Sequence, residues 1–576
     1  MTFLHLRKAF DKRVNRTYLS IVHGYRDLEG KSKSKTVKSL GFLDELEKIY
    51  DDPITHFTAL AKKMDKERIL NNSITITLDL AEPINTETEN RKNYGYIIFS
   101  KIYHELKLDR FLDNARRHEK FIFNSEAIMR LLLYTRLMSP GSKRAAVLDK
   151  EQFFDKFDFT LYDVYDGLSH FHKISDKLQL HLHEQVVEQY GRKTSLVYYD
   201  VTNYHFEIDK QDELRRRGCA KQRRDKPIVQ MGLLLDTESL PITYKIFPGN
   251  THDSQTLMPA LAEVKKHFKT DRIVVVADKG LNSGDNIVFN TALGDGYIYS
   301  KSVRGASAGF QEWLLEPSGY YYNRDKLKIK SKIVPNAKIK YTVEKDGKKK
   351  KTKTTTVEQK WVAFYSEKYA KRAKHKREEI VAKALQMIKN PAKYKNNCDY
   401  GAAGYIKNIK VDKETGEIKN YEDYLYLDEV RIAEEERLDG YYAIITSELD
   451  ETDEQIVKLY RGLWKIEESF KISKGVLGTR PLYLKTEEHI NAHFLICFVA
   501  LLIARIAEKR MDGKFTIQQI TDTLQRVNCS HIKQNIWLFD YADSLTSELQ
   551  STFGIEFSRR HMTLQEIKNN LAQSKS

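Results

Sequence analysis

Short alternating patterns of apolar and polar residues open the chain. The segment TYLSIVHGY at 17–25 is rich in aromatic and β-branched residues, and SKTVKSLGF at 34–42 follows it after a charged, turn-like stretch. Two such segments in succession are typical of a β-hairpin. We therefore expect residues 1–75 to form an N-terminal region that contains a hairpin and ends in a charged helical linker.

Helical spacing replaces this alternation over residues 76–190. In YIIFSKIYHELKL and EAIMRLLLYTRLM, apolar residues recur three and four positions apart, which is the period of an amphipathic helix. Pro140 and Gly141 interrupt the pattern in its middle, as these helix-breaking residues do. The segment is predicted to be a compact helical domain.

Strands and helices alternate over residues 191–304. TSLVYYDVT, IVQMGLLLD and LPITYKIF predict three strands that are close enough in sequence to be antiparallel neighbours. DRIVVVADKG is almost continuously apolar and predicts a fourth strand that is buried on both faces. Helices are expected on either side of it, and GYIYSKS predicts a fifth strand. The order β-β-β-α-β-α-β is that of an RNase H-like core, an α/β fold with a mixed five-stranded sheet.

The pattern changes over residues 305–438, which are rich in Lys, Tyr and Thr and carry a hairpin signal, KDGK, at 345–348. We expect a β-rich insertion that interrupts the core. Strand character returns in DGYYAIITS, at the start of a second core part predicted over residues 439–510. A long helix from about 453 to 475 and an apolar helix belong to that part, and residues 511–576 are predicted to form a mostly helical tail.

The composition favours a polyanionic partner. Lys and Arg number 96 against 80 Asp and Glu, which gives a net charge of +16 and a pI of about 9.2. Basic side chains neutralise phosphates and release counterions, so nucleic acid is the commonest such partner, although a merely basic protein is an equal alternative from charge alone.

Cysteine usage and hydropathy exclude other classes. The four cysteines stand far apart without a CxxC spacing, which excludes a disulfide scaffold and disfavours a cysteine-based zinc site. The start of the chain shows no signal peptide. The most apolar run, Phe494 to Ala504, is too short to span a bilayer and predicts a buried core helix.

Two aspartates follow predicted strands. Asp200 ends the run LVYYD, and Asp278 directly follows IVVVA. An acid in apolar surroundings is costly unless it is paired or bound to metal, and ligand sites in α/β sheets favour the carboxyl ends of strands. Each is a candidate metal ligand, with an ordinary strand-end or loop acid as the alternative.

A glutamate in the long predicted helix is the third candidate. Glu467 lies at the edge of the apolar stripe of LYRGLWKIEESFKISKGVL, and Glu468 points away from that stripe. Tyr460 and Lys474 are seven residues before and after Glu467, so the three share one strip of a continuous helix. Such a strip suits a metal and a phosphate, but an amphipathic helix with a solvated rim has the same composition.

Taken together, these acids and their surroundings resemble a known family. The stretches YYDVTNYHFE, PIVQMGLLLDTESLPITYKIFPGNTHD, VVVADKGLNSGDNI and YRGLWKIEESFKISKG are similar to the DDE insertion-sequence transposases that carry a Tyr-Arg-Glu-Lys signature, within the RNase H-like superfamily. The opening YLSIVHGYRD…GKSKSKTVKSLGF also resembles the start of one branch of that group. The resemblance covers most of the chain.

The resemblance implies a set of site residues. Asp200, Asp278 and Glu467 match the three catalytic acids, which would hold two Mg²⁺ ions, with Mn²⁺ as a possible substitute. Tyr460 and Lys474 match the signature residues that contact the DNA-end phosphate. The family Arg usually stands where this chain has Leu463, and Arg461 is a neighbouring substitute. Further DNA contacts are expected from the remaining basic and aromatic candidates: Trp464, Lys471, Arg223 and Arg224.

The resemblance also implies a function. We expect a DNA transposase that cleaves at terminal inverted repeats and inserts its element by metal-dependent strand transfer from a 3′-OH, in a cut-and-paste reaction. Residues 1–75 and 76–190 would bind the DNA ends, in a homodimer on DNA, in the bacterial cytoplasm with the nucleoid and without a membrane. The alternatives are an inactive DNA-binding repressor or scaffold derived from a transposase, and a non-transposing nuclease with the same core.

Overall fold

The computed structural model describes residues 3–11, 14–26, 32–71, 81, 83, 90–117, 119–218, 226–268, 272–323, 327–345, 348–389, 400–407, 410–411, 418–419, 425–480 and 482–575. These form two compact units. Unit 1 comprises residues 1–92, 528–541 and 558–573, and unit 2 comprises residues 93–527, 542–557 and 574–576.

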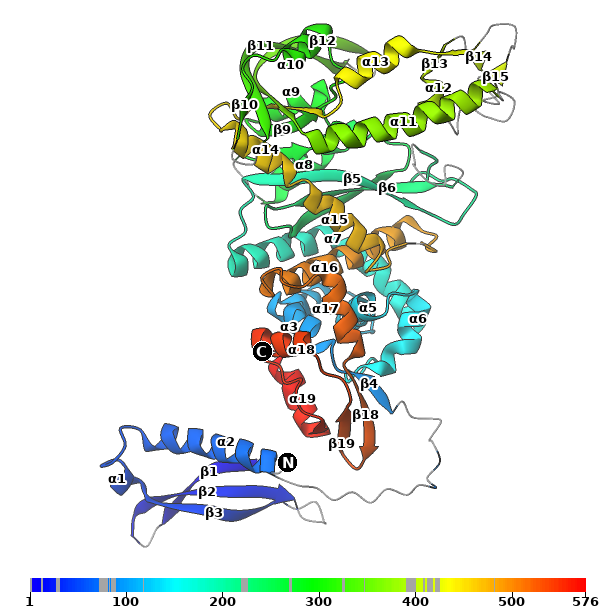
Figure 1. Cartoon of the computed structure of the whole chain (residues 1–576). Coiled ribbons are helices and arrows are strands. Elements are labelled where there is room, and N and C mark those ends of the chain that lie inside the picture. Colours follow the sequence, from blue (N-terminus) through cyan, green and yellow to red (C-terminus); the bar gives the residue numbers. More distant parts are fainter. Residues whose placement is uncertain are drawn as a thin grey trace. The chain divides into compact units, whose positions relative to one another are not determined.

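Unit 1 begins with an antiparallel sheet of three strands, covered by two helices (Figure 1). The strands pair in the order β1 (Phe3–Asp11), β2 (Arg16–Arg26) and β3 (Ser32–Phe42), and the helices are α1 (Leu43–Leu46) and α2 (Pro53–Asn71). The hairpin expected at 17–42 is formed by β2 and β3, and β1 is an additional strand. Leu19 and Ile21 are fully buried and pack against Phe57 and Ala61 of α2.

A second sheet of four strands uses the C-terminal part of the chain. Its order is β20 (His561–Thr563), β19 (Ile536–Phe539), β18 (Asn528–Lys533) and β4 (Arg91–Asn93), with α19 (Leu564–Gln573) following β20. Residues 511–576 therefore contain strands besides the expected helices, because short segments such as IWLF carry no helical period.

Unit 2 contains a helical part built around one apolar helix (Figure 1). Its helices are α3 (Ile97–Glu105), α4 (Leu108–Arg116), α5 (Ser125–Met138), α6 (Lys143–Leu148), the 3-10 turn η1 (Asp149–Gln152), α7 (Leu161–Tyr190), α16 (Glu487–Arg510), α17 (Ile517–Arg526) and α18 (Ser544–Phe553). In the part of the chain that the structure describes, only α16 is long and apolar enough to cross a membrane, and 94% of its most apolar window is buried within the protein. It packs against α3, α5 and α7, so the expected core helix is confirmed.

A large mixed sheet forms the rest of the frame of unit 2. Its nine strands pair in the order β10 (Tyr321–Tyr322), β11 (Lys328–Lys345), β12 (Lys348–Tyr365), β17 (Tyr441–Thr446), β9 (Gly296–Lys301), β8 (Val274–Ala277), β5 (Leu196–His205), β6 (Ile228–Leu235) and β7 (Pro241–Pro248). β5, β6 and β7 are antiparallel neighbours, as expected, while β5, β8 and β9 are parallel. The predicted mixed α/β fold is confirmed. The sheet is wider than five strands because β17 and the hairpin β11–β12 extend it.

Further helices of unit 2 cover the nine-stranded sheet and the segment that follows β12. They are the 3-10 turn η2 (Asp253–Gln255), α8 (Leu257–Phe268), α9 (Gly284–Ala292), α10 (Ala308–Leu315), α11 (Glu367–Lys389), α12 (Tyr400–Ala403) and α13 (Glu429–Arg437). Two short strand pairs lie beyond α11: β13 (Ile406–Lys407) with β16 (Tyr426–Leu427), and β14 (Lys410–Val411) with β15 (Ile418–Lys419).

The two faces of β5 have different neighbours. Val197 and Tyr199 belong to an apolar cluster with Leu257 and Leu261 of α8. Alternate residues of a strand point to opposite faces, so Tyr198 and Asp200 face the other side. This alternation places Asp200 on the face that the helices after β17 cover.

The long helix expected over 453–475 is two helices, α14 (Asp453–Arg461) and α15 (Trp464–Lys474), separated by Gly462 and Leu463. Gly462 packs so closely on the sheet that a Cβ there would lie 2.1 Å from the Tyr198 hydroxyl oxygen. The break corrects the assumption of one continuous strip through Tyr460 and Lys474, because the two residues stand on separate helices.

Candidate active site

Sheet register brings the two predicted aspartates to one level. In the parallel pair of β5 and β8, Tyr198 lies opposite Val276. Asp200 and Asp278 each stand two residues further along, Asp200 in the middle of β5 and Asp278 directly after β8. Both acids follow apolar runs, from which the sequence predicts two buried strands. The parallel pairing of these strands brings the two acids close together.

A cleft of about 1000 Å³ contains all three predicted acids, since Asp200, Asp278 and Glu467 line it together. α15 lies across β5 and carries Glu467 into this wall. The acids come from elements that are separated by up to 267 positions in the chain numbering. The structure therefore brings together the residues that the sequence selected.

Burial and like charges change the ionisation of Asp200. Desolvation, with the neighbouring carboxylates of Asp278, Asp253 and Glu467, raises its pKa to about 7. The backbone N–H of Val201 donates to Asp200 Oδ1 at 2.8 Å and opposes the shift. The negative charge of three other carboxylates therefore reaches Asp200.

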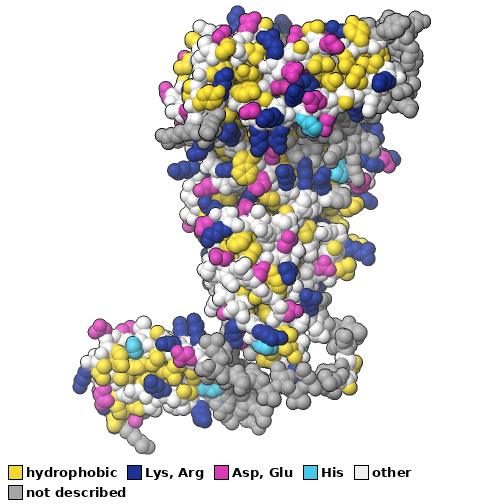
Figure 2. Space-filling model, in the orientation of Figure 1, with side chains coloured by type: hydrophobic (Ala, Val, Ile, Leu, Met, Phe, Trp, Pro, Cys, Tyr) yellow, Lys and Arg dark blue, Asp and Glu magenta, His cyan; other side chains and the backbone are white. Residues whose placement is uncertain are grey.

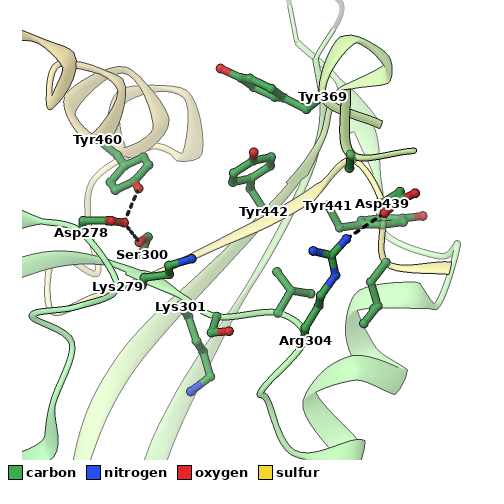
Figure 3. Close-up of a pocket in the computed structure, with 15 residues that line it drawn as sticks. Asp278, Lys279, Ser300, Lys301, Arg304, Tyr369, Asp439, Tyr441, Tyr442 and Tyr460 are labelled. Carbon is green, nitrogen blue, oxygen red and sulfur yellow. Dashed lines mark hydrogen bonds and ion pairs between the residues drawn. The ribbon is translucent and has the colours of Figure 1, made fainter. Parts of the chain in front are cut away.

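Asp278 is held by two hydroxyl groups (Figure 3). Ser300 Oγ donates to Asp278 Oδ1 at 2.9 Å, and Tyr460 Oη lies 3.5 Å from the same oxygen. Burial raises the pKa of Tyr460, so its hydroxyl stays protonated and can donate. These contacts fix the orientation of the carboxylate at the end of β8.

A second hollow adjoins Asp278 on the side of Tyr460 (Figure 3). Its volume is about 260 Å³, and Tyr369, Tyr442 and Lys279 point toward it. Arg304, also in its wall, pairs with Asp439 at 2.9 Å. The hollow is aromatic and basic, whereas the main cleft concentrates the acids.

Lys474 lies on the basic side of the main cleft. Its ammonium donates to Thr202 Oγ1 and lies 5.0 Å from the centre of the Tyr204 ring. Burial lowers the pKa of Lys474 to about 8, Arg480 lowers it in the same direction, and Asp200 opposes the shift. A base so close to the acids suits a phosphate that contacts both.

Trp464, Arg461 and Lys471, also predicted DNA contacts, do not line this cleft. Trp464 is 57% exposed, and Arg461 and Lys471 are also exposed. Leu463, at the position of the family Arg, is buried with 8% of its surface exposed, so the full four-residue signature is not shown. Arg223 and Arg224 lie outside the described residues.

Three further residues of the cleft wall were not singled out from the sequence. Asp253 stands at a helix start, where an acid is ordinarily a cap, yet it lines the cleft and accepts from Gln230 Nε2 at 3.5 Å. Arg217 and Arg480 add positive charge opposite the acids. Arg217 belongs to the basic run RRRGCAKQRRDK at 215–226, a composition that favours DNA contact, while nothing in the local pattern around GTRPL marks Arg480.

The donor set has the chemistry that a hard divalent cation needs. Carboxylate oxygens are the ligands that Mg²⁺ and Mn²⁺ prefer. A bound divalent cation would neutralise the negative charge that the acids bring to the cleft. Among the described residues, no three His, Cys, Asp or Glu side chains are gathered closely enough to hold a metal ion as they stand. The residues thus fit the cation by donor type and charge.

Two family profiles match the chain. Residues 6–72 match the IS1634 family transposase N-terminal domain, and residues 199–503 match the transposase DDE domain. No curated protein matches.

Two solved structures share a distant likeness. A piggyBac transposase synaptic complex with hairpin DNA has a TM-score of 0.34 and 9% identity, covering 84% of each chain. A Mos1 transposase paired-end complex with the left transposon end has a TM-score of 0.14 and 10% identity, covering 41% of this chain and 65% of that one. The match to the transposase DDE domain spans more than half of the 576 residues. The chain therefore belongs to the DDE transposases of insertion sequences and is a DNA transposase.

Proposed function

We propose that this transposase moves its element by cut-and-paste, with Asp200, Asp278 and Glu467 as the catalytic acids. DNA would be hydrolysed at the terminal inverted repeats, and the freed 3′-OH would then attack target DNA. The observation that carries the proposal is the convergence of these three acids in one cleft.

The catalytic core is proposed to be RNase H-like. The five strands expected from the sequence are β5 to β9, which lie together in the order β7-β6-β5-β8-β9 within the nine-stranded sheet. This order supports the assignment, because it places β5 at the centre of the five strands beside β8, with Asp200 on β5 and Asp278 directly after β8.

Two Mg²⁺ ions are the proposed cofactors, and Asp200, Asp278 and Glu467 are the residues that would hold them. When bound, such ions lower the pKa of water and neutralise charge on the phosphate that is attacked. The contribution of the chain is to hold the acids in place. Ser300 and Tyr460 orient Asp278, and the N–H of Val201 orients Asp200.

Basic side chains of the cleft are proposed to bind the DNA backbone. Lys474, Arg480 and Arg217 line the same cavity as the acids. Their charge attracts phosphates without reading sequence. A backbone held by these three groups would place a phosphate against the carboxylates.

The path of the duplex beyond the cleft is proposed to follow exposed basic surface. Figure 2 shows Lys and Arg side chains gathered between the levels of α11 and β5 in unit 2. α11 exposes Lys371, Arg372, Lys374 and Lys376. Such clusters supply the salt-dependent part of DNA affinity.

Recognition of the DNA ends is assigned to residues 1–75 and 76–190, the first of which contains the matched N-terminal domain. Both ends must be held together for joining, so a homodimer on DNA is proposed. The bacterial cytoplasm, with the nucleoid, is the proposed location.

The test is excision and integration of a marker flanked by the DNA that borders the gene, with Mg²⁺ present. Wild type is expected to excise and join the marker, and Asp278→Ala to do neither. Cleavage without joining would instead identify a nuclease. Binding without cleavage by both proteins would leave only a DNA-binding protein derived from a transposase.

A further inference from the structure

A second basic pocket lies beside the active-site cleft. Its volume is about 280 Å³, and Arg136, Lys143 and Arg480 contribute its positive charge. Arg480 also lines the active-site cleft, so the two cavities share a wall. Among the described residues that line this second pocket, none is Asp or Glu.

Lys143 is the most unusual group of this pocket. It is 5% exposed, and within the described chain its ammonium lies 3.1 Å from His493 Nδ1. His493 Nε2 faces the carbonyl oxygen of Thr479 at 3.2 Å. Since a carbonyl only accepts, Nε2 carries the proton and Nδ1 accepts from the Lys143 ammonium.

Burial of this ammonium is unfavourable in the absence of an anion. Desolvation and the charge of Arg136 lower the pKa of Lys143 to about 7, and burial with the charges of Lys143 and Arg136 holds the pKa of His493 well below its usual range. A buried charge is ordinarily paired. An anion in the pocket would supply the missing partner.

Arg136 is fixed in place by the backbone around the pocket. Its Nη1 donates to the carbonyl oxygens of Leu477 and Gly478 at 3.1 and 3.0 Å, and its Nη2 donates to Gly141 at 3.2 Å. All three partners are neutral, so the guanidinium charge is not compensated. A Cβ at Gly478 would lie 2.8 Å from Pro140, which shows how closely the two loops approach behind the guanidinium.

We propose that this pocket binds a backbone phosphate of the DNA strand that leaves the active-site cleft past Arg480. The ligand chemistry is a phosphate diester, held by Lys143 with the charges of Arg136 and Arg480 around it. Tyr165 and Tyr483, at 36% and 72% exposure, stand where the adjoining nucleotide would pass. The proposal rests on the proposed function, because its ligand is the DNA substrate.

The test compares wild type with Lys143→Met in binding to a duplex of the DNA that flanks the gene, across salt concentrations. Losing one phosphate contact should reduce the slope of log K against log[salt] by about 0.9 and the affinity roughly tenfold. Lys177→Met removes an exposed lysine of α7 that does not line the pocket and should keep the wild-type slope. Lys143→Gln, with unfolding temperatures for all variants, excludes misfolding as the cause.

A scan with single methylphosphonate substitutions locates the contact. One position should weaken binding by wild type and have no effect on Lys143→Met. If wild type binds DNA and both Lys143 variants keep the wild-type slope of log K against log[salt], the phosphate-pocket proposal is overturned and the proposed function is not. Saturable binding of inorganic phosphate that Lys143→Met abolishes, without a change of the DNA slope, would assign the pocket to a free anion and overturn the DNA source. Failure of wild type to bind DNA would overturn the proposed function itself.

Discussion

Arg505 of α16 holds Glu468, and this ion pair distinguishes two adjacent glutamates of α15. Arg505 Nη2 lies 2.9 Å from Glu468 Oε2 and donates to Ser469 Oγ at 2.8 Å. Adjacent residues of a helix project about 100° apart. Glu468 is thus tied to the helical part of unit 2, and Glu467 is free to line the cleft.

This asymmetry predicts different effects of two matched substitutions. Glu467→Gln should reduce DNA cleavage by about 10³-fold, since losing one metal ligand removes several kcal/mol of transition-state stabilisation at about 1.4 kcal/mol per decade. Glu468→Gln should retain cleavage within a few-fold and lower the unfolding temperature, because it leaves Arg505 buried without this partner. Rates on end DNA and thermal unfolding check both. Equal loss of cleavage in the two variants would contradict the assignment of Glu467.

Asp200 predicts a pH-dependent stability difference. Its pKa is raised to about 7 in the folded, metal-free protein, so the protonated form stabilises the fold at low pH. That stabilisation is lost as pH rises from about 4, the unfolded value, to about 7. Asp200→Asn should therefore unfold at nearly the wild-type temperature at pH 4 and be more stable by roughly 1–3 kcal/mol above pH 7. Denaturant unfolding in EDTA measures this, and a gap that does not grow with pH would count against the carboxylate cluster.

Lys474 predicts a pH dependence of DNA affinity. Its pKa is lowered to about 8, so the ammonium loses its proton, and its attraction for phosphate, as pH rises past 8. Wild-type affinity should fall by up to about tenfold between pH 7 and pH 9.5. Lys474→Met should bind more weakly at pH 7 and show a flatter profile over this range. Parallel profiles for the two proteins would show that Lys474 does not contact the DNA.

The close contact between Gly462 and Tyr198 predicts that α15 is positioned by the break before it. Gly462→Ala should cost about 1–3 kcal/mol of stability, the usual range for overpacking, and reduce cleavage because Glu467 moves. Tyr198→Phe removes the hydroxyl that the new methyl group would meet, so the double variant should recover part of both losses. Additive effects of the two changes, measured by unfolding and cleavage, would exclude this contact as the cause.

The sequence predicted which acids line the cleft better than it predicted the helices and strands that carry them. Asp200 and Asp278 each follow an apolar run that predicts a buried strand, and this is local information, although β5 continues past Asp200 to His205. Gly462, at the break between α14 and α15, packs against Tyr198, which lies 264 positions earlier, and no local pattern contains that contact.

The basic residues of the cleft could be predicted only in part, because their positions also depend on contacts between distant parts of the chain. Arg480 follows α15 in an irregular segment without periodicity, and its importance comes from the two cavities that it borders. Asp253 lies in a helix-start sequence, where an acid is ordinarily a cap. Only the folded chain shows that it faces Asp200.

The central claim is that Asp200, Asp278 and Glu467 together catalyse cleavage and joining with Mg²⁺. The most direct measurement is cleavage and strand transfer of end DNA by wild type and by the single variants Asp200→Asn, Asp278→Asn, Glu467→Gln and Asp253→Asn, each matched for DNA binding. We predict that wild type acts with Mg²⁺ and not with EDTA, that the first three variants bind DNA without cutting it, and that Asp253→Asn retains measurable activity. Cleavage by any of the first three at near the wild-type rate, or cleavage in EDTA, would contradict the account.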